Sequence, residues 1–205
     1  MSEIARAAVL ALACAASSLA AANPPQIEAG RKLAVAQCAT CHGQDGNAPD
    51  AQFPRLAGQL QPFLELQLRN YRSGERPHPV MAGVAKGLKD RDIAAVSAYY
   101  ASLAPMRHGG ALDAQLVARG EQIYRVGKPG APACQWCHGE RGEGTAPVFA
   151  RLAGQHPEFV VEALKPYRVV PRFGNPYANV MKAVVQEWSD EDLAAVAAYV
   201  ASLNR

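Results

Sequence analysis

The 205-residue sequence lacks several patterns that would decide its class at once. No convincing alternation of apolar and polar residues appears, so a strand-rich fold is not predicted. No excess of one charge appears either: 21 basic and 18 acidic residues are well mixed, and the net charge of +3 is no signature of nucleic-acid binding. Cysteine is scarce, with five residues. Four of these five lie in a short pattern that the chain carries twice.

Each copy of this pattern has the form Cys-x-x-Cys-His. On a helical turn, residues i, i+3 and i+4 lie on one face, so two thiols and an imidazole come together. This spacing lets the thiols form thioethers with the two vinyl groups of one haem while the imidazole reaches its iron. We therefore predict two covalently bound haem c groups. The residues are Cys38, Cys41 and His42 in the first copy and Cys134, Cys137 and His138 in the second.

Zinc sites and thioredoxin-like dithiols are the alternatives for paired cysteines. No strand-rich βαβ pattern precedes either copy, and both copies carry the adjacent histidine, which a dithiol site does not need. A zinc site would bring four ligands close together in space. Each half of the chain is also small for a self-sufficient apolar core, and a haem would supply an apolar centre. The sequence therefore favours haem.

The fifth cysteine, Cys14, lies in the apolar run Ala7–Leu19 near the N-terminus. Small residues follow at 20–22, and we predict that residues 1–22 form a secretory signal that is removed. An uncleaved anchor is one alternative, although so short an alanine-rich run spans a bilayer poorly. Lipidation of Cys14 is another. Export suits c-type haem, because it places the thiols outside the cytoplasm.

The rest of the chain is an internal duplication. The two copies are offset by 96 residues at the cysteine motifs and by 100 residues in their last segments, so the second copy has gained four residues. We place this insertion in a loop at 169–178. The matched segments are Arg-Leu-Ala-Gly-Gln at 55–59 and 151–155, Tyr-Arg at 71–72 and 167–168, and acidic, alanine-rich stretches at 90–99 and 190–199.

Apolar residues at helical spacing predict an all-α fold, with three main helices in each copy. The predicted helices are Ile27–Gln37, Leu56–Tyr71 and a segment ending at Leu103 in the first copy, and Ala114–Val126, Leu152–Tyr167 and a segment ending at Leu203 in the second. Ser189 and Asp192 form a predicted capping box for the last of them. The predicted domains are residues 23–104 and 113–205, joined by a linker at 105–112 that is too short for free tumbling.

A histidine-bound iron has a second axial position, and its occupant decides the function. Met81 and Met181 stand at equivalent places in the two copies, whereas Met106 lies in the linker. A thioether favours ferrous iron and raises the reduction potential. The alternative is that both methionines only fill the core. We favour ligation, and with both axial positions filled we predict electron transfer rather than catalysis.

These features together resemble the two-haem cytochrome c4 family, over the whole of residues 23–205. The resemblance rests on the paired haem motifs, the repeated Arg-Leu-Ala-Gly-Gln and Tyr-Arg, the two methionines and the last helix of each copy. It implies two tandem class I cytochrome c domains that face each other, with haem propionates near the interface. It also implies a periplasmic or membrane-associated shuttle that carries electrons between respiratory complexes, often toward a terminal oxidase. The implied iron ligands are His42 with Met81 and His138 with Met181.

The resemblance also suggests partners for the ligating histidines. Related cytochromes place a proline twelve residues after the histidine, where its carbonyl accepts the second ring N–H; here Pro54 matches and Ala150 replaces it in the second copy. Four residues are candidates to face haem propionates: Arg55, Arg151, Tyr71 and Tyr167. The alternative is that they only form surface ion pairs and pack in the core.

Three further histidines match nothing in the other copy. The nearest competitor of Met81 is His78, three residues before it, and we predict a solvated loop histidine there. We predict the same for His108 in the linker and for His156.

Three functions remain open at this point. The favoured one is a periplasmic two-haem carrier with redox protein partners. The second is an electron-transfer subunit held on a dehydrogenase. The third is a two-haem enzyme such as a thiosulfate dehydrogenase or a peroxidase, which needs an open iron or an unusual ligand such as cysteine. Outside the signal and the haem motifs the chain has no further cysteine, which disfavours the enzyme.

Overall fold

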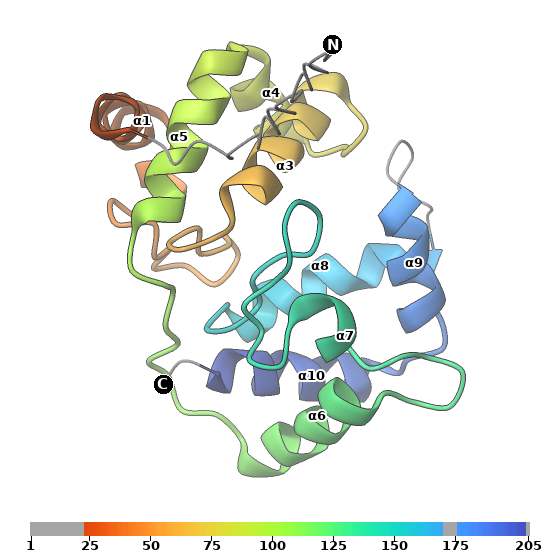
Figure 1. The fold of residues 1–205 in the computed structure, drawn as a ribbon. Helices are drawn as coiled ribbons and strands as arrows, with labels where there is room; N and C mark the ends of the chain where they lie inside the picture. The colour runs from red at the N-terminus through yellow and green to blue at the C-terminus, as the bar shows by residue number, and fades with distance from the viewer. Residues whose placement is uncertain (1–22, 170–175, 204–205) are drawn as a thin grey trace, which may run out of the picture.

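The computed structural model describes residues 23–169 and 176–203, and within them the chain forms two groups of five helices (Figure 1). The first group is α1 Pro24–Gln37, α2 Ala39–His42, α3 Gln61–Ser73, α4 Pro79–Lys86 and α5 Asp90–Ser102. The second is α6 Ala114–Val126, α7 Gln135–His138, α8 Pro157–Val169, α9 Pro176–Val185 and α10 Asp190–Ser202. Extended pairing in these residues is limited to two isolated bridges, so the prediction of an all-α fold is confirmed.

The two groups pack in the same way. Helix α5 packs on α1 and α3, and α3 packs on α4; correspondingly, α10 packs on α6 and α8, and α8 packs on α9. Matched glycines allow the first and last helix of each group to touch. A Cβ on Gly30 would lie 2.0 Å from the Ala95 carbonyl oxygen, and a Cβ on Gly120 would lie 2.0 Å from that of Ala195. The duplication seen in the sequence is therefore repeated in the packing.

The last helix of each group supplies much of the core. Ile93 and Leu193 are fully buried at matched positions, and Val96 and Val196 follow one turn later. Full burial of such a side chain stabilises the fold by roughly 1.5–3 kcal/mol. The predicted capping box at the start of α10 is confirmed: the Asp192 N–H donates to Ser189 Oγ at 3.2 Å, and the Ser189 N–H donates to Asp192 Oδ2 at 3.1 Å.

The predicted middle helices begin too early. Residues 56–60 and 152–156 form turns, and α3 and α8 start only after them. The physical reason lies in the two glycines of Arg-Leu-Ala-Gly-Gln: Gly58 and Gly154 have φ values of +66° and +80°, in the left-handed region that ends a right-handed helix.

Two helices, α4 and α9, were not predicted. Each begins at a proline that is pre-set for the first turn of a helix. The loop predicted at 169–178 is therefore wrong at 169, which ends α8, and at 176–178, which belong to α9; residues 170–175 lie outside the described residues. The predicted signal at 1–22 also lies outside them. In the described parts of the chain, no helix is both long enough and apolar enough to cross a bilayer.

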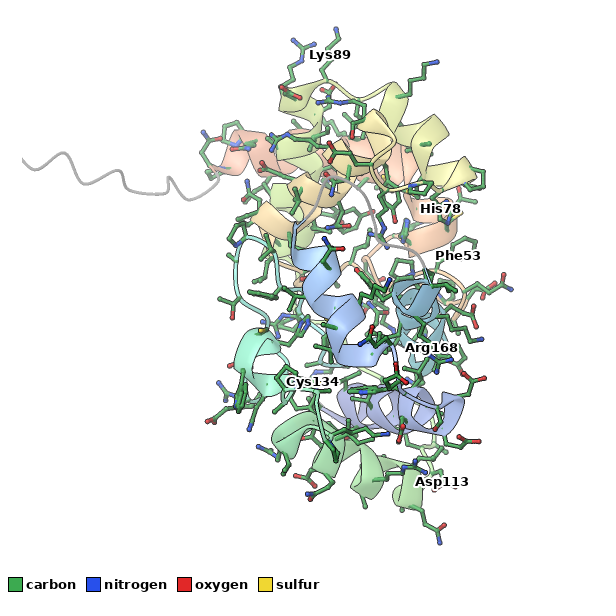
Figure 2. The ribbon with its side chains drawn as sticks, turned by 90° about the vertical axis from the view of Figure 1, so that its right-hand side faces the viewer. Phe53, His78, Lys89, Asp113, Cys134 and Arg168 are labelled. Carbon is green, nitrogen blue, oxygen red and sulfur yellow. The ribbon has the colours of Figure 1, made fainter. Side chains whose placement is uncertain are left out.

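The two groups of helices lie one above the other in the figures. Lys89, just before α5, and Asp113, just before α6, are at opposite ends of the view in Figure 2. Hydrogen bonds between the Arg-Leu-Ala-Gly-Gln turns join the two groups. The expectation that the domains pack on one another is thus confirmed by direct contacts.

Candidate haem-binding sites

The first haem motif forms one tight turn after α1. The backbone N–H groups of Cys41 and His42 both donate to the Cys38 carbonyl, at 3.2 and 3.0 Å. This turn gives the i, i+3 and i+4 side chains the common face that the sequence predicts. In the second motif the same two bonds go to the Cys134 carbonyl, at 3.2 and 2.9 Å. Figure 2 labels Cys134 at the start of α7.

The four motif cysteines are half-buried. Burial raises the pKa of the Cys38 thiol and raises the pKa of the Cys134 thiol to about 12. A buried thiol with a raised pKa is a poor nucleophile, so the first cysteine of each motif is poorly suited to start dithiol exchange. Nor do the described residues contain a cluster of three or more His, Cys, Asp or Glu side chains that could hold a metal ion, as a zinc site would require.

Each motif histidine has one ring nitrogen in a hydrogen bond and leaves the other as a candidate ligand for iron. His42 Nδ1 lies 2.9 Å from the Pro54 carbonyl oxygen, and His138 Nδ1 lies 2.9 Å from that of Ala150. Because a carbonyl only accepts, Nδ1 carries the proton in both rings. Burial lowers the pKa of both imidazoles, so both are neutral at pH 7. The lone pair is then on Nε2, the atom that a haem iron requires, and the residues present fit the group.

Phenylalanine rings support both histidines, a feature that the sequence analysis missed. Phe53 meets the His42 ring edge-on with centroids 6.3 Å apart, and Phe149 meets the His138 ring at 5.9 Å. Each phenylalanine directly precedes the residue whose carbonyl accepts the histidine proton. Their matched place in the repeat is the signal that could have identified them.

The two predicted methionine ligands lie on matched helices. Met81 is on α4 and Met181 on α9, and both are half-buried. Met181 packs against the hydrophobic core of its domain. Met106 behaves differently, since it is fully buried in the linker and its sulfur accepts a bond from Gln155 Nε2 at 3.5 Å.

Two of the three predicted solvated histidines are not solvated. His78 is exposed as predicted, and its Nδ1 accepts the Met81 N–H at 3.2 Å and so caps α4. His156 is only 5% exposed, because its Nε2 donates to the Ala48 carbonyl of the other domain at 2.8 Å. His108 is half-buried against the region where α6 and α8 begin. The prediction for His156 failed because the other domain packs over it, and that for His108 failed because the linker packs against α6 and α8.

The two candidate propionate arginines lie at the domain interface. Arg55 Nη1 donates to the Gly154 carbonyl at 2.6 Å, and Arg151 Nε donates to the Gly58 carbonyl at 2.9 Å. The alternative of plain surface ion pairs is therefore wrong. The Arg55 Nε atom is buried without a hydrogen-bond partner among the described residues, a donor that a propionate of a bound haem would satisfy.

One side chain sets the two haem motifs apart on the surface. Trp136, between the cysteines of the second motif, is 74% exposed, whereas Thr40 holds the matching place in the first. The surroundings of the two motifs are therefore unequal at this position.

Comparison with known proteins agrees with this geometry. The family model for cytochrome c matches residues 27–104 and again 117–204. A cytochrome c4 of Pseudomonas aeruginosa is 37% identical over 173 residues, which cover 83% of this chain and 85% of that one. The chain belongs to the cytochrome c4 family. The crystal structure of reduced cytochrome c4 from Pseudomonas stutzeri superposes with a TM-score of 0.79 at 32% identity, covering 86% of this chain and 98% of that one.

Membership in the family establishes the cofactor and the general role. The protein carries two covalently bound haem c groups in two tandem cytochrome c domains, and it is an electron carrier that exchanges electrons with redox proteins. Other relatives have a more specific name. A thiosulfate dehydrogenase electron acceptor of Thiomonas intermedia is 34% identical over 201 residues, which cover 94% of this chain and 86% of that one.

Proposed function

We propose that each haem iron is held by one histidine and one methionine of its own domain. The observation that carries this proposal is the matched pair of neutral histidines, each with Nδ1 on a carbonyl and Nε2 left for iron. The proposed ligands are His42 with Met81 and His138 with Met181, and the proposed thioether cysteines are Cys38, Cys41, Cys134 and Cys137. The proposed domains remain 23–104 and 113–205, with a linker at 105–112 and a signal at 1–22.

The side chains of the chain then divide the work. The bound haem supplies a one-electron iron couple, and the thioethers keep it in place. The Pro54 and Ala150 carbonyls fix the tautomer and the orientation of each histidine. A methionine thioether bound to the iron would favour its ferrous state and would leave no position for a substrate. The protein is accordingly a carrier and not an enzyme.

The proposed location is the periplasm, and the proposed partners are a respiratory donor and a terminal oxidase. The predicted export signal supports this location, because c-type haem attachment then occurs outside the cytoplasm. Peripheral association with the membrane is compatible with the same role.

A second candidate is the electron acceptor of a thiosulfate-oxidising dehydrogenase. The name of the Thiomonas intermedia relative favours it. A solved thiosulfate dehydrogenase from Marichromatium purpuratum includes a region like this chain, with a TM-score of 0.75 at 38% identity, which covers 86% of this chain and 40% of that one. Mixing the oxidised protein with such an enzyme and thiosulfate distinguishes the candidates: rapid haem reduction supports the second, and its absence supports the first.

The experiment that tests the ligands is carbon monoxide binding to the dithionite-reduced protein, followed by visible spectroscopy. We expect no spectral change, because both irons are six-coordinate. Met81→Ala and Met181→Ala should each lower the reduction potential of one haem and let that haem bind carbon monoxide. Met106→Leu is the matched control and should leave carbon monoxide binding absent. Binding by the unsubstituted protein would sink the assignment and favour an enzyme.

A further inference from the structure

The two Arg-Leu-Ala-Gly-Gln turns are joined by hydrogen bonds from their glutamine side chains. Gln155 Oε1 accepts the Arg55 N–H at 2.9 Å, and Gln155 Nε2 donates to the Arg55 carbonyl at 3.0 Å. Gln59 does the same to Arg151, at 2.8 and 2.9 Å. Both glutamines are about 95% buried, with 4% and 5% of their surface exposed. Each amide thus pairs with the backbone of the opposite domain as a neighbouring strand would.

The peptide group whose N–H donates to each glutamine is the same one whose carbonyl accepts a hydrogen bond from a motif histidine. In the peptide between Pro54 and Arg55, the carbonyl accepts His42 Nδ1–H and the N–H donates to Gln155 Oε1. The peptide between Ala150 and Arg151 stands in the same way between His138 and Gln59. Two hydrogen bonds and one peptide therefore connect each histidine with a side chain of the other domain.

We propose that Gln155 and Gln59 are positioning residues that tune, across the domain interface, the axial histidine of the opposite domain. This inference rests on the proposed histidine ligands. A peptide whose N–H is bound to an acceptor has a more negative carbonyl oxygen, since hydrogen bonds in a chain polarise one another. That oxygen pulls more strongly on the Nδ1 proton, and the imidazole becomes a stronger donor to iron.

The direction of the effect follows from this polarisation. A more basic imidazole stabilises ferric iron more than ferrous iron, so each glutamine lowers the reduction potential of the haem in the other domain. Removing Gln155 should therefore raise the potential of the haem held by His42, and removing Gln59 should raise that of the haem held by His138. The effect is crossed between the domains.

The test is a redox titration of Gln155→Leu and Gln59→Leu, followed by NMR to assign each haem. We expect a rise at the haem of the opposite domain and no shift at the haem of the substituted domain. In the reduced protein, the Nδ1 proton of the opposite histidine should move upfield as its hydrogen bond weakens. Gln122→Leu, at an exposed site on α6, is the control and should move neither haem.

A second variant separates tuning from loss of packing. Gln155→Glu keeps an acceptor for the Arg55 N–H, so it should not raise the potential of the opposite haem. Small-angle scattering checks that the domains remain together. A shift in the haem of the substituted domain, equal shifts in both haems, no shift, or the same rise for Glu as for Leu would each overturn the proposal. Failure of the ligands themselves would show separately, as carbon monoxide binding by the unsubstituted protein.

Discussion

A buried carboxylate, Asp192, ties three segments of the second domain together. Its Oδ1 atom accepts from Arg119 Nη2 on α6 at 2.7 Å, and its Oδ2 atom pairs with Lys128 in the loop after α6. The same carboxylate accepts the Ser189 N–H that caps α10. Only 3% of the residue is exposed, so these partners replace water almost completely.

The pKa of Asp192 predicts a loss of stability in acid. Burial alone would raise this pKa, but Lys128, Arg119 and the Ser189 N–H together lower it from 3.8 to about 2. A carboxylate with a lowered pKa stabilises the fold above its unfolded pKa, and this contribution disappears as the pH falls from about 4 to 2. The contribution is about 2 kcal/mol. Asp192→Asn should lower the free energy of unfolding at pH 7 and remove this part of the acid dependence, as measured by denaturant titration.

The matched residue of the first domain gives the control. Asp92 also accepts the N–H of its cap residue, Lys89, at 3.0 Å, but its side chain is 24% exposed and its ion pair with Arg91 is 3.6 Å long. Partly exposed ion pairs contribute little. Asp92→Asn should therefore cost clearly less than Asp192→Asn. Equal losses from the two substitutions would contradict the role assigned to the buried ion pairs.

At the scale of elements, the Arg-Leu-Ala-Gly-Gln turns leave no room beside the linker. A Cβ on Gly58 would lie 2.6 Å from Pro105 Cα, and a Cβ on Gly154 would lie 2.2 Å from the Met106 carbonyl oxygen. The linker therefore runs against both turns, and the Met106 N–H donates to the Ala57 carbonyl at 3.1 Å. Residues predicted only to connect the domains thus form part of their contact.

This close approach predicts a strong effect of Gly154→Ala. Alanine in the left-handed region costs roughly 1–2 kcal/mol by itself, and the clash with backbone atoms of the linker adds to that cost. Gly74→Ala is the matched control, because Gly74 has φ +84° and nothing within 4 Å of the added Cβ. Thermal unfolding should show a clearly larger drop in Tm for Gly154→Ala. Similar drops in Tm for the two variants would mean that the linker moves away from the added methyl group at no cost in stability.

Each domain has a pair of tyrosine rings in contact, but the two domains take the second tyrosine from different helices. Tyr99 and Tyr100, both on α5, have ring centroids 5.3 Å apart and an interplanar angle of 51°. In the second domain the pair is Tyr124 on α6 with Tyr199 on α10, at 5.2 Å and 50°. Val200 holds the place that corresponds to Tyr100. Matching the repeats by sequence cannot reveal this exchange, because the second ring comes from a different helix.

At the scale of the whole molecule, the haem attachment sites and the main helices could be predicted from the sequence, whereas the contacts between the two domains could not. The haem motifs can be recognised from the spacing of their cysteines and histidine. The main helices can be recognised from apolar residues at helical intervals. The hydrogen bonds between the domains join Gln, Arg and His side chains to backbone groups of the other domain. Every residue offers such a backbone group, so the sequence does not show which one a given side chain will meet. For this reason His156 was predicted to be solvated, although it donates to Ala48 of the other domain.

The interface predicts that the two domains stay together after the chain is cut between them. Gly109 is exposed and has no atom within 4 Å of an added Cβ, so a protease site inserted after it should be tolerated. The cut leaves Met106 seated against Gly154 and leaves every hydrogen bond between the two turns intact. We expect the two fragments of the cut holoprotein to elute together in gel filtration at micromolar concentration.

Replacing both glutamines tests whether these bonds hold the fragments together. Each hydrogen bond contributes about 0.5–1.5 kcal/mol net, and the double variant Gln59→Leu/Gln155→Leu removes four bonds between the domains. Even the lower end, about 2 kcal/mol, corresponds to a roughly 30-fold weaker association of the cut fragments. The Gln122→Leu variant, cut in the same way, should associate as tightly as the unsubstituted protein. If the fragments of the unsubstituted protein separated freely, the linker rather than the paired turns would hold the domains together. The proposed effect of each glutamine on the haem of the opposite domain would then lose its structural basis.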